Sequence, residues 1–312
     1  MSAGVGSAAG LELESAPASR GPWRQAVGRL WRRPLGVVAL ALLALLLVVG
    51  ILAGAIAPYY PGQEFIEYIT RPQPPLTAHH VLGTDALGRD FLTQFVYAIR
   101  ETAFSALACA GGSTVVGVVV GALAGFYGGW LDELVGWATR VVVAVPAIAV
   151  LIIIAVWSPL PLTPMQDGLW LLLLMWTGVA RVVRASVAMQ RRNEYVEAAE
   201  ASGSSSLRIL VRHVLPNATG TIIVAATNVV GQSIAIIATV DYIGYGYNKP
   251  ESPTLGGLVA DATQATATSL GNAPSIASVW WLYILPVSLL VLVLLAVAFA
   301  GDALGDALNP SG

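Results

Sequence analysis

The sequence predicts an all-α, polytopic membrane protein with six transmembrane helices, and three observations support this fold class. Hydrophobic residues make up 56% of the 312 residues and charged residues only 11%, whereas a soluble domain carries roughly 25% charged residues. The apolar residues gather in runs long enough to cross a bilayer. The basic residues fall mainly on one side of the resulting topology. This composition excludes a soluble enzyme and a nucleic-acid-binding protein.

The first apolar run, Leu35–Ala57, has 23 uncharged residues, enough to span the ~30 Å hydrocarbon core of a bilayer. It is too long for a cleaved signal peptide, whose apolar region has about 7–15 residues, so we expect a permanent anchor. It follows residues 1–34, a predicted cytoplasmic tail. Within that tail, residues 20–34 interleave five arginines with Trp23 and Trp31, which is typical of a basic amphipathic segment at a membrane surface.

The remaining chain divides by composition into three parts. Residues 58–100 are polar and contain five prolines, and we predict an extracytoplasmic insert. Residues 101–302 are predicted to hold five further transmembrane helices, and residues 303–312 a second cytoplasmic tail. The apolar runs that define these helices are Thr102–Phe126, Leu134–Trp157, Gly168–Arg184, Ala218–Val240 and Ile276–Ala300.

Two of these runs are weaker than the others. The fourth is uncharged over only 13 residues and reaches spanning length by including Arg181 and Arg184 at its far end. The third has Arg140 near one end and is interrupted by Pro146, and Pro286 interrupts the sixth. Either proline could kink its helix, although prolines that are simply tolerated are more common in membrane helices.

The placement of basic residues supports six spans. With a cytoplasmic N-terminus, 12 basic residues lie inside and 4 outside, as the positive-inside rule requires. If the fourth run did not cross, the distribution would become 7 inside and 9 outside. We therefore expect the fourth run to cross and both termini to be cytoplasmic.

The sequence predicts that the chain has no energy source or catalytic site of its own. No ionisable residue lies at mid-membrane depth in the six runs, which argues against a proton-coupled carrier. A phosphate-binding P-loop needs a Gly-rich turn followed by Lys and Ser or Thr, whereas the only lysine, Lys249, precedes Pro250. The only cysteine, Cys109, excludes a disulfide framework and a cysteine metal site. We expect no catalytic residue, metal or bound cofactor in this chain.

Residues 191–217, RRNEYVEAAEASGSSSLRILVRHVLPN, are the most informative segment. Asn193 suits a helix N-cap, Gly203 suits the left-handed residue that ends a helix, and Pro216 suits the first turn of the next helix. We predict two short helices forming a compact knob, whose Ala198 and Ala199 leave a flat face for another protein. The alternative is a solvated connecting loop, but connectors have a median of only about 4–6 residues.

The EAA triplet at residues 197–199, followed by Gly203 and by Leu215-Pro216, resembles the EAA motif of ABC-importer membrane subunits. That family usually has an apolar residue two positions before Leu-Pro, whereas this chain has His213, which is common in peptide-type permeases. The stretches LGTDALGRD (residues 82–90), GFYGGWLD (125–132) and GDALGDALNP (301–310) resemble further motifs of dipeptide and oligopeptide permeases, in the family's order.

The resemblance implies a permease subunit with the type I ABC importer architecture, in the plasma (inner) membrane of a prokaryote. It implies a homologous second permease, two cytoplasmic ATPase subunits that bind ATP and Mg²⁺, and an external substrate-binding protein as partners. The knob would transmit movement of the ATPases to the membrane helices. The residues assigned to this coupling loop are Glu197, Ala198, Ala199, Gly203, Arg208, His213, Leu215 and Pro216.

The chain departs from the family pattern after the fifth run, where it reads IATVDYIGYGY over residues 237–247. The family usually has a Glu shortly before Phe-Leu-Gly-Leu-Gly there. We assign Asp241, Tyr242, Tyr245 and Tyr247 to the translocation path or outer gate, although an interfacial aromatic belt explains the tyrosines equally well. We expect di- or oligopeptides as cargo, with nickel chelates or oligosaccharides as alternatives. A stand-alone channel or a membrane enzyme is the alternative from a different class.

Two smaller patterns complete the sequence analysis. Gly117, Gly121 and Gly125 repeat every four residues, which lets helices pack closely in lipid, and we expect contact inside the chain's own bundle rather than with a partner subunit. His79 and His80 lie near acidic residues in the insert. Their spacing matches no metal-binding motif, and we expect an ordinary surface loop there rather than a metal site.

Overall fold

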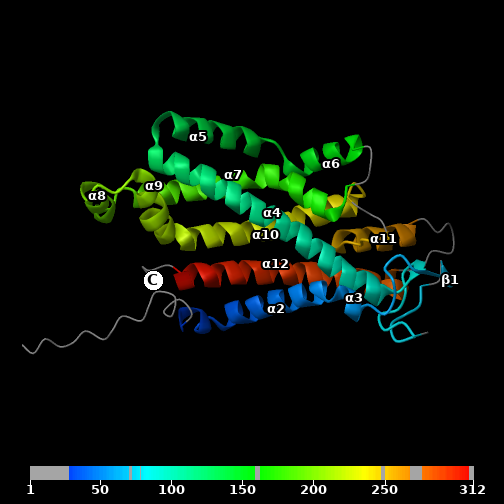
Figure 1. The fold of residues 1–312 in the computed structure, drawn as a ribbon. Helices are drawn as coiled ribbons and strands as arrows, with labels where there is room; N and C mark the ends of the chain where they lie inside the picture. Colours follow the sequence, from blue (N-terminus) through cyan, green and yellow to red (C-terminus); the bar gives the residue numbers. More distant parts are fainter. Residues whose placement is uncertain are drawn as a thin grey trace, which may run out of the picture.

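The computed structural model describes residues 28–69, 72–77, 79–158, 162–246, 250–267 and 276–308. This part of the chain is an elongated bundle of long helices lying side by side (Figure 1). Within these described ranges, five helices are long and apolar enough to cross a membrane, and a bent helix pair makes a sixth span if it crosses as one unit. The predicted fold class, a helical polytopic membrane protein, is confirmed, with five or six candidate spans.

The long helices coincide with the predicted apolar runs and extend beyond most of them. They are α2 (Pro34–Ile51), α4 (Phe91–Tyr127), α7 (Pro164–Gln190), α10 (Leu215–Ile243) and α12 (Trp280–Leu308). The fourth run, the weakest in sequence, is part of a 27-residue helix.

Helix α4 begins inside the segment predicted as an extracytoplasmic insert, residues 58–100. Asp90 caps its first turn, because its carboxylate accepts hydrogen bonds from the Thr93 amide and hydroxyl, both at 2.8 Å. Such a cap satisfies amides that the helix cannot pair internally. Since these polar residues cap the helix, its start could not be read from hydropathy.

The third run is not one straight helix. It forms α5 (Gly129–Ala144) and α6 (Ala147–Trp157), whose axes differ by 71°. Between them Val145 is extended, with φ −91° and ψ 124°, as the ring of a following proline favours. The helix therefore breaks at Pro146, so of the two alternatives for this proline the structure shows the interruption. Pro286, in contrast, lies within an uninterrupted α12.

Helices α4 and α7 approach closely along the glycine repeat. A Cβ atom on Gly121 would lie 2.5 Å from the carbonyl oxygen of Ala180, and one on Gly117 would lie 2.5 Å from the Cβ of Val179. A Cβ on Gly125 would overlap the backbone of α7 at Arg184. The three glycines thus face another helix of the same chain. Gly121 and Gly125 let the two backbones meet directly, and Gly117 leaves room for the Val179 side chain.

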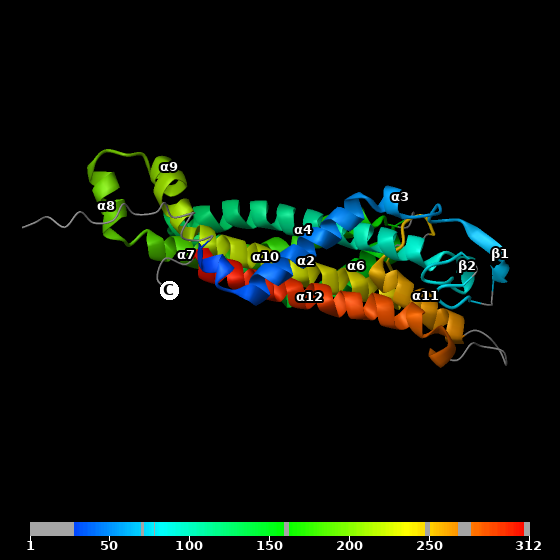
Figure 2. The ribbon, with the colours of Figure 1, turned by 90° about the horizontal axis from the view of Figure 1, so that it is seen from below.

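The two ends of the bundle carry different structures (Figures 1 and 2). At one end lie the start of α2, the end of α12, and two short helices, α8 (Glu194–Ala201) and α9 (Ser206–Ile209). At the other end lie the short helix α3 (Ala53–Ile56), an antiparallel pair of strands, β1 (Glu64–Ile69) and β2 (Leu87–Arg89), and α11 (Leu255–Ala267). The sequence analysis did not predict α3, these strands or α11.

We predict that Gly121→Leu destabilises the bundle, because the new side chain meets the backbone of α7 and cannot be accommodated by a rotamer change. Overpacking of this kind costs about 1–3 kcal/mol, equivalent to a fall of about 5 °C in the unfolding midpoint. The measurement is thermal unfolding of the purified protein. Gly178→Leu on α7 is the matched control, because a Cβ there meets no atom within 4 Å. Equal midpoints for the two variants would contradict the close-packing argument.

Candidate functional site

Helices α8 and α9 form a knob, residues 193–214, that protrudes from one end of the bundle (Figure 2). Asn193 occupies the N-cap position of α8, but its side chain accepts no hydrogen bond from the helix amides and instead donates to the Gln190 side chain at 2.8 Å. Gly203 follows the helix with φ +78°. The amide of Ser204 donates to the carbonyl of Ala199 at 3.1 Å, which is the closing bond of a Schellman motif.

The knob is anchored by apolar side chains that belong to the core of the bundle. Val196 of α8 is 1% exposed, and Ile209 and Val214 are fully buried. They pack in one cluster with Phe126 of α4 and Val187 of α7. Because both short helices contribute to that cluster, the knob is a rigid projection and not a loosely attached loop.

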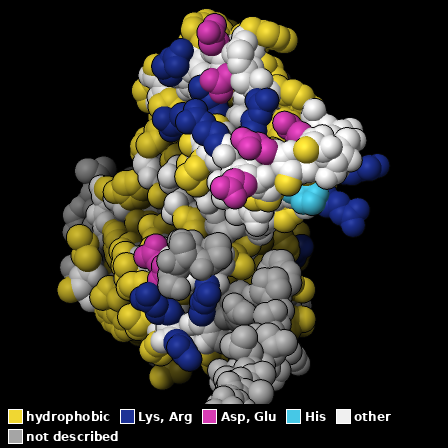
Figure 3. All heavy atoms as spheres, turned by 90° about the vertical axis from the view of Figure 1, so that its left-hand side faces the viewer, with side chains coloured by type: hydrophobic (Ala, Val, Ile, Leu, Met, Phe, Trp, Pro, Cys, Tyr) yellow, Lys and Arg dark blue, Asp and Glu magenta, His cyan; other side chains and the backbone are white. Residues whose placement is uncertain are grey.

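The opposite face of the knob is open to solvent and charged. Glu197 and Ala198 of α8 are exposed, and so is Arg208 of α9. Figure 3, which faces this end of the molecule, shows basic and acidic side chains gathered here with hydrophobic side chains around them. Ala199 and Leu215 are half-buried against the core cluster. The predicted coupling residues therefore divide between an exposed face and the contacts that support it.

The second helix of the knob does not stop before the fifth span. A π-helical turn, Leu210–Val214, joins α9 to α10 without a break, and the amide of Leu215 donates to the carbonyl of Leu210. Pro216 lies in the first turn of α10, as predicted, but α10 continues from α9 through the π turn. A proline ring clashes with the carbonyl four residues earlier in a regular helix, and the wider π turn lies just before it. His213, in that turn, is half-buried.

Two arginine side chains hold the helix ends together around the base of the knob. The guanidinium of Arg184 on α7 makes two hydrogen bonds with the carboxylate of Asp132 on α5, one of them 2.6 Å between Nη2 and Oδ2. Arg191 lies over the ring of Phe126 at 5.2 Å and donates to its carbonyl. The sequence analysis did not assign these bonds. They explain the GFYGGWLD stretch, because it forms the turn between α4 and α5 and contains both Phe126 and Asp132.

At the opposite end, a buried ion cluster holds the segment before α4 against α11. The guanidinium of Arg89 lies 2.6 Å from Asp85 and 2.7 Å from Asp261 of α11, and Arg89 is only 2% exposed. Burial raises the pKa of the Asp85 carboxyl, and the Arg89 guanidinium opposes that rise. The indole of Trp281 on α12 also donates to the Thr84 carbonyl at 3.4 Å. The LGTDALGRD stretch, which precedes α4, is therefore bound to both α11 and α12.

His80 is a structural residue of the same region. Its Nδ1 atom lies 2.7 Å from the carboxylate of Asp90, and its ring contacts the rings of Tyr59, Phe65 and Tyr68 at 4.9–5.6 Å between centroids. It is 3% exposed, so the expectation of a surface loop was wrong for this histidine. Within the described ranges, no group of three or more His, Cys, Asp or Glu side chains is arranged to hold a metal ion.

The residues predicted for the outer gate differ in their exposure to solvent. Asp241, near the end of α10, is 2% exposed, whereas Tyr242 and Tyr245 are 47% and 44% exposed. Tyr247 lies outside the described residues. The sequence analysis missed Asp167, a second buried carboxylate, which lies in the first turn of α7. The role of this region in transport stays a prediction.

Comparison with known proteins identifies the class of protein. Residues 117–311 match the family described as the inner membrane component of binding-protein-dependent transport systems, and residues 21–75 match the N-terminal transmembrane domain of oligopeptide transport permease C. The chain belongs to this family of type I ABC permeases. It is therefore a multi-pass membrane subunit of a transporter.

Curated relatives cover nearly the whole chain. The oligopeptide transport system permease protein OppC of Mycobacterium tuberculosis is 33% identical over 279 residues, covering 88% of this chain and 90% of that protein. The dipeptide transport system permease protein DppC of Alkalihalophilus pseudofirmus is 31% identical, covering 93% and 90%. The glutathione transport system permease protein GsiD of Pectobacterium atrosepticum is 28% identical, covering 93% and 92%.

We predict that Arg89→Met destabilises the protein more than Asp261→Asn. Removing the guanidinium leaves Asp85 buried without its cation, which costs about 3–5 kcal/mol, whereas an asparagine at position 261 still accepts a hydrogen bond from Arg89. The measurement is the thermal midpoint of each purified variant, together with the rate of protease cleavage between residues 58 and 90. If Asp261→Asn proves as damaging as Arg89→Met, the cluster is not centred on Arg89.

Proposed function

We propose that this chain is one of two homologous permease subunits of an ATP-driven importer in a bacterial inner membrane. Two cytoplasmic ATPase subunits bind and hydrolyse ATP with Mg²⁺, and an external binding protein delivers the cargo. The knob of α8 and α9 docks on an ATPase subunit, and α10 carries its movement to the opposite end of the bundle. The observation that carries this proposal is the continuous helical connection from the knob through the π turn into α10.

We propose di- or oligopeptides as the cargo. The names of the relatives, which refer to oligopeptide, dipeptide and glutathione transport, support peptides over nickel chelates or oligosaccharides. The helices of the bundle offer few fixed polar contacts for a cargo, so we assign most of the selectivity to the binding protein. Identification of the ligand held by the cognate binding protein tests this assignment, and a purified binding protein that holds only a metal chelate or a sugar would overturn it.

We predict that Glu197→Arg lowers transport at least tenfold and abolishes the stimulation of ATP hydrolysis by loaded binding protein. Glu197 is exposed, so the charge reversal alters the docking face without disturbing the core. The measurement is peptide uptake and ATP hydrolysis by the reconstituted importer. Glu133→Arg is the matched control, since Glu133 is an exposed acid on α5 outside the knob. Normal uptake by the Glu197→Arg importer would remove the coupling role, and uptake by this chain without ATPase subunits would indicate a stand-alone channel.

We also predict the orientation of the bundle, with the knob and both tails in the cytoplasm. Single cysteines at Ala201 of the knob and Glu67 of β1 provide the test, because both positions are exposed and the native Cys109 is fully buried. A membrane-impermeant maleimide applied to intact spheroplasts should label the Glu67→Cys protein at once. It should label the Ala201→Cys protein only after permeabilisation, and the reverse pattern would invert the topology.

A further inference from the structure

Two arginine side chains from different helices converge on one glycine of α5. A Cβ atom on Gly136 would lie 2.7 Å from Nη1 of Arg184, which belongs to α7, and 3.4 Å from Nη1 of Arg140, which belongs to α5. The two nitrogens are therefore no more than 6.1 Å apart. Because glycine has no side chain, position 136 places no atom between them.

Arg184 presents its free nitrogen in a fixed direction. Its Nε and Nη2 atoms both bind the carboxylate of Asp132, with 2.6 Å between Nη2 and Oδ2. A two-point contact of this kind fixes the plane of the guanidinium group. Nη1, the remaining nitrogen, has no hydrogen-bond partner among the described residues and lies against Gly136. It is a donor that is already oriented for an acceptor.

Arg140 has no carboxylate partner in the part of the chain that the structure describes. No Asp or Glu oxygen there lies within 4.0 Å of its guanidinium nitrogens. The side chain reaches back one helical turn, to the level of Gly136, and so approaches the Arg184 guanidinium. Like charges at this distance repel each other, and an unpaired cation in a candidate span is costly. An anion between the two groups would remove both costs.

The charge balance around this point is positive. Helix α5 and residues 181–192, at the end of α7, contain five arginines but only two carboxylates, Asp132 and Glu133. Asp132 is already bound by Arg184, and Glu133 is exposed and makes no ion pair with a described residue. The knob that follows adds three glutamates and two arginines, and the total stays positive. The acids of this end of the molecule therefore do not neutralise the two converging arginines.

The surroundings indicate which anion is available. Trp130 and Trp137 of α5 are 75% and 60% exposed, and their spacing of seven residues places them on one side of the helix. Exposed indole rings favour the level of the lipid headgroups. Trp137 lies three residues before Arg140, about one turn away. At that level the bilayer supplies phosphate groups, and a phosphate can accept from two guanidinium groups through hydrogen bonds of about 2.7–2.9 Å.

We propose that Arg140 and Arg184 form a binding site for the headgroup phosphate of an anionic phospholipid, open at Gly136. Nη1 of each arginine donates to the phosphate, and Asp132 positions Arg184 for this contact. The site goes beyond the importer function proposed above, and only its assignment to the cytoplasmic leaflet rests on the proposed orientation. Loss of peptide transport therefore does not count against the site, and loss of lipid binding does not count against the importer assignment.

The test measures binding of phosphatidylglycerol to the whole purified importer by native mass spectrometry. We expect Arg140→Gln to lower the affinity for one bound lipid about tenfold, the loss expected for a hydrogen bond between charged groups. Arg140→Lys, which keeps the positive charge, should retain most of the affinity. Arg192→Gln is the matched control, because Arg192 is an exposed arginine at the end of α7, and its affinity should equal that of the native importer. Equal affinities for Arg140→Gln and the native importer would overturn the site.

A second variant changes the site without removing a charge. Gly136→Ala places a methyl group where the two Nη1 atoms converge and displaces only the flexible ends of arginine side chains, so the importer should still assemble. We expect the same loss of lipid affinity. Gly111→Ala is its control, because a Cβ there would meet no atom within 4 Å. Normal lipid binding by Gly136→Ala would contradict the convergence of the two donors on one phosphate.

Three further measurements distinguish the sources of the anion. Displacement of the bound lipid by excess inorganic phosphate would show that the site takes a soluble phosphate and would overturn the lipid assignment. Equal affinity for phosphatidylcholine would overturn the preference for an anionic headgroup. A photoreactive amino acid at position 137 should capture lipid in the native membrane. Capture of the second permease subunit there would show that a protein carboxylate, and not a phosphate, faces the two arginines.

Discussion

The close approach of α4 and α7 is the contact on which the rest of the structure depends. Glycines at 117, 121 and 125 bring the two backbones together, where apolar side chains gain little from leaving lipid and packing must supply the stability. The same pair of helices positions both ends of the bundle. Arg184 on α7 binds Asp132 of α5, and Arg191 at the end of α7 contacts Phe126 of α4. At the other end of the bundle, Asp90 caps α4.

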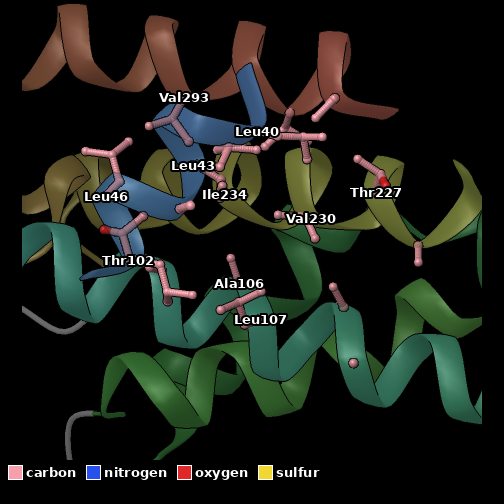
Figure 4. A pocket seen from close by; sticks show the side chains of 18 of the residues that line it. Leu40, Leu43, Leu46, Thr102, Ala106, Leu107, Thr227, Val230, Ile234 and Val293 are labelled. Atoms are coloured by element: carbon pink, nitrogen blue, oxygen red, sulfur yellow. The ribbon is translucent and has the colours of Figure 1, made fainter. Parts of the chain in front are cut away.

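Charge is concentrated at the two ends of the bundle, and it is paired in the clusters around Arg89 and Arg184. Arg89 pairs with the carboxylates of Asp85 and Asp261, and the Arg184–Asp132 pair joins α7 to α5 near the knob. A buried ion pair fixes geometry strictly, because breaking it leaves an uncompensated charge. This argument applies to the buried Arg89 cluster, whereas the Arg184–Asp132 pair is only partly buried. The middle of the bundle is held by apolar packing and contains an apolar cavity beside α2 (Figure 4).

Mechanical continuity links these parts. The knob is packed into the core by Val196 and Ile209, and the π turn joins it to α10, which ends at Gly244 beside the buried Asp241. At that end α10 contacts α11, since Gly256 approaches the backbone of Ala238 too closely for a side chain. Arg89 then connects α11 to the segment that precedes α4. We propose that displacement of the knob reaches the opposite end along this path.

The sequence by itself determined the fold class, the apolar runs and the knob with its left-handed Gly203, because hydrophobic length, charge placement and glycine conformation are local properties. It also located the glycine repeat and the motifs of the family. Only the tertiary structure decided which residues meet across the chain: Arg89 with Asp261, Arg184 with Asp132, and His80 with three aromatic rings. It also decided the 71° break at Pro146, the origin of α4 at Asp90 and the cavity beside α2. These features depend on how separate segments pack, and spacing along one chain does not encode distance between helices.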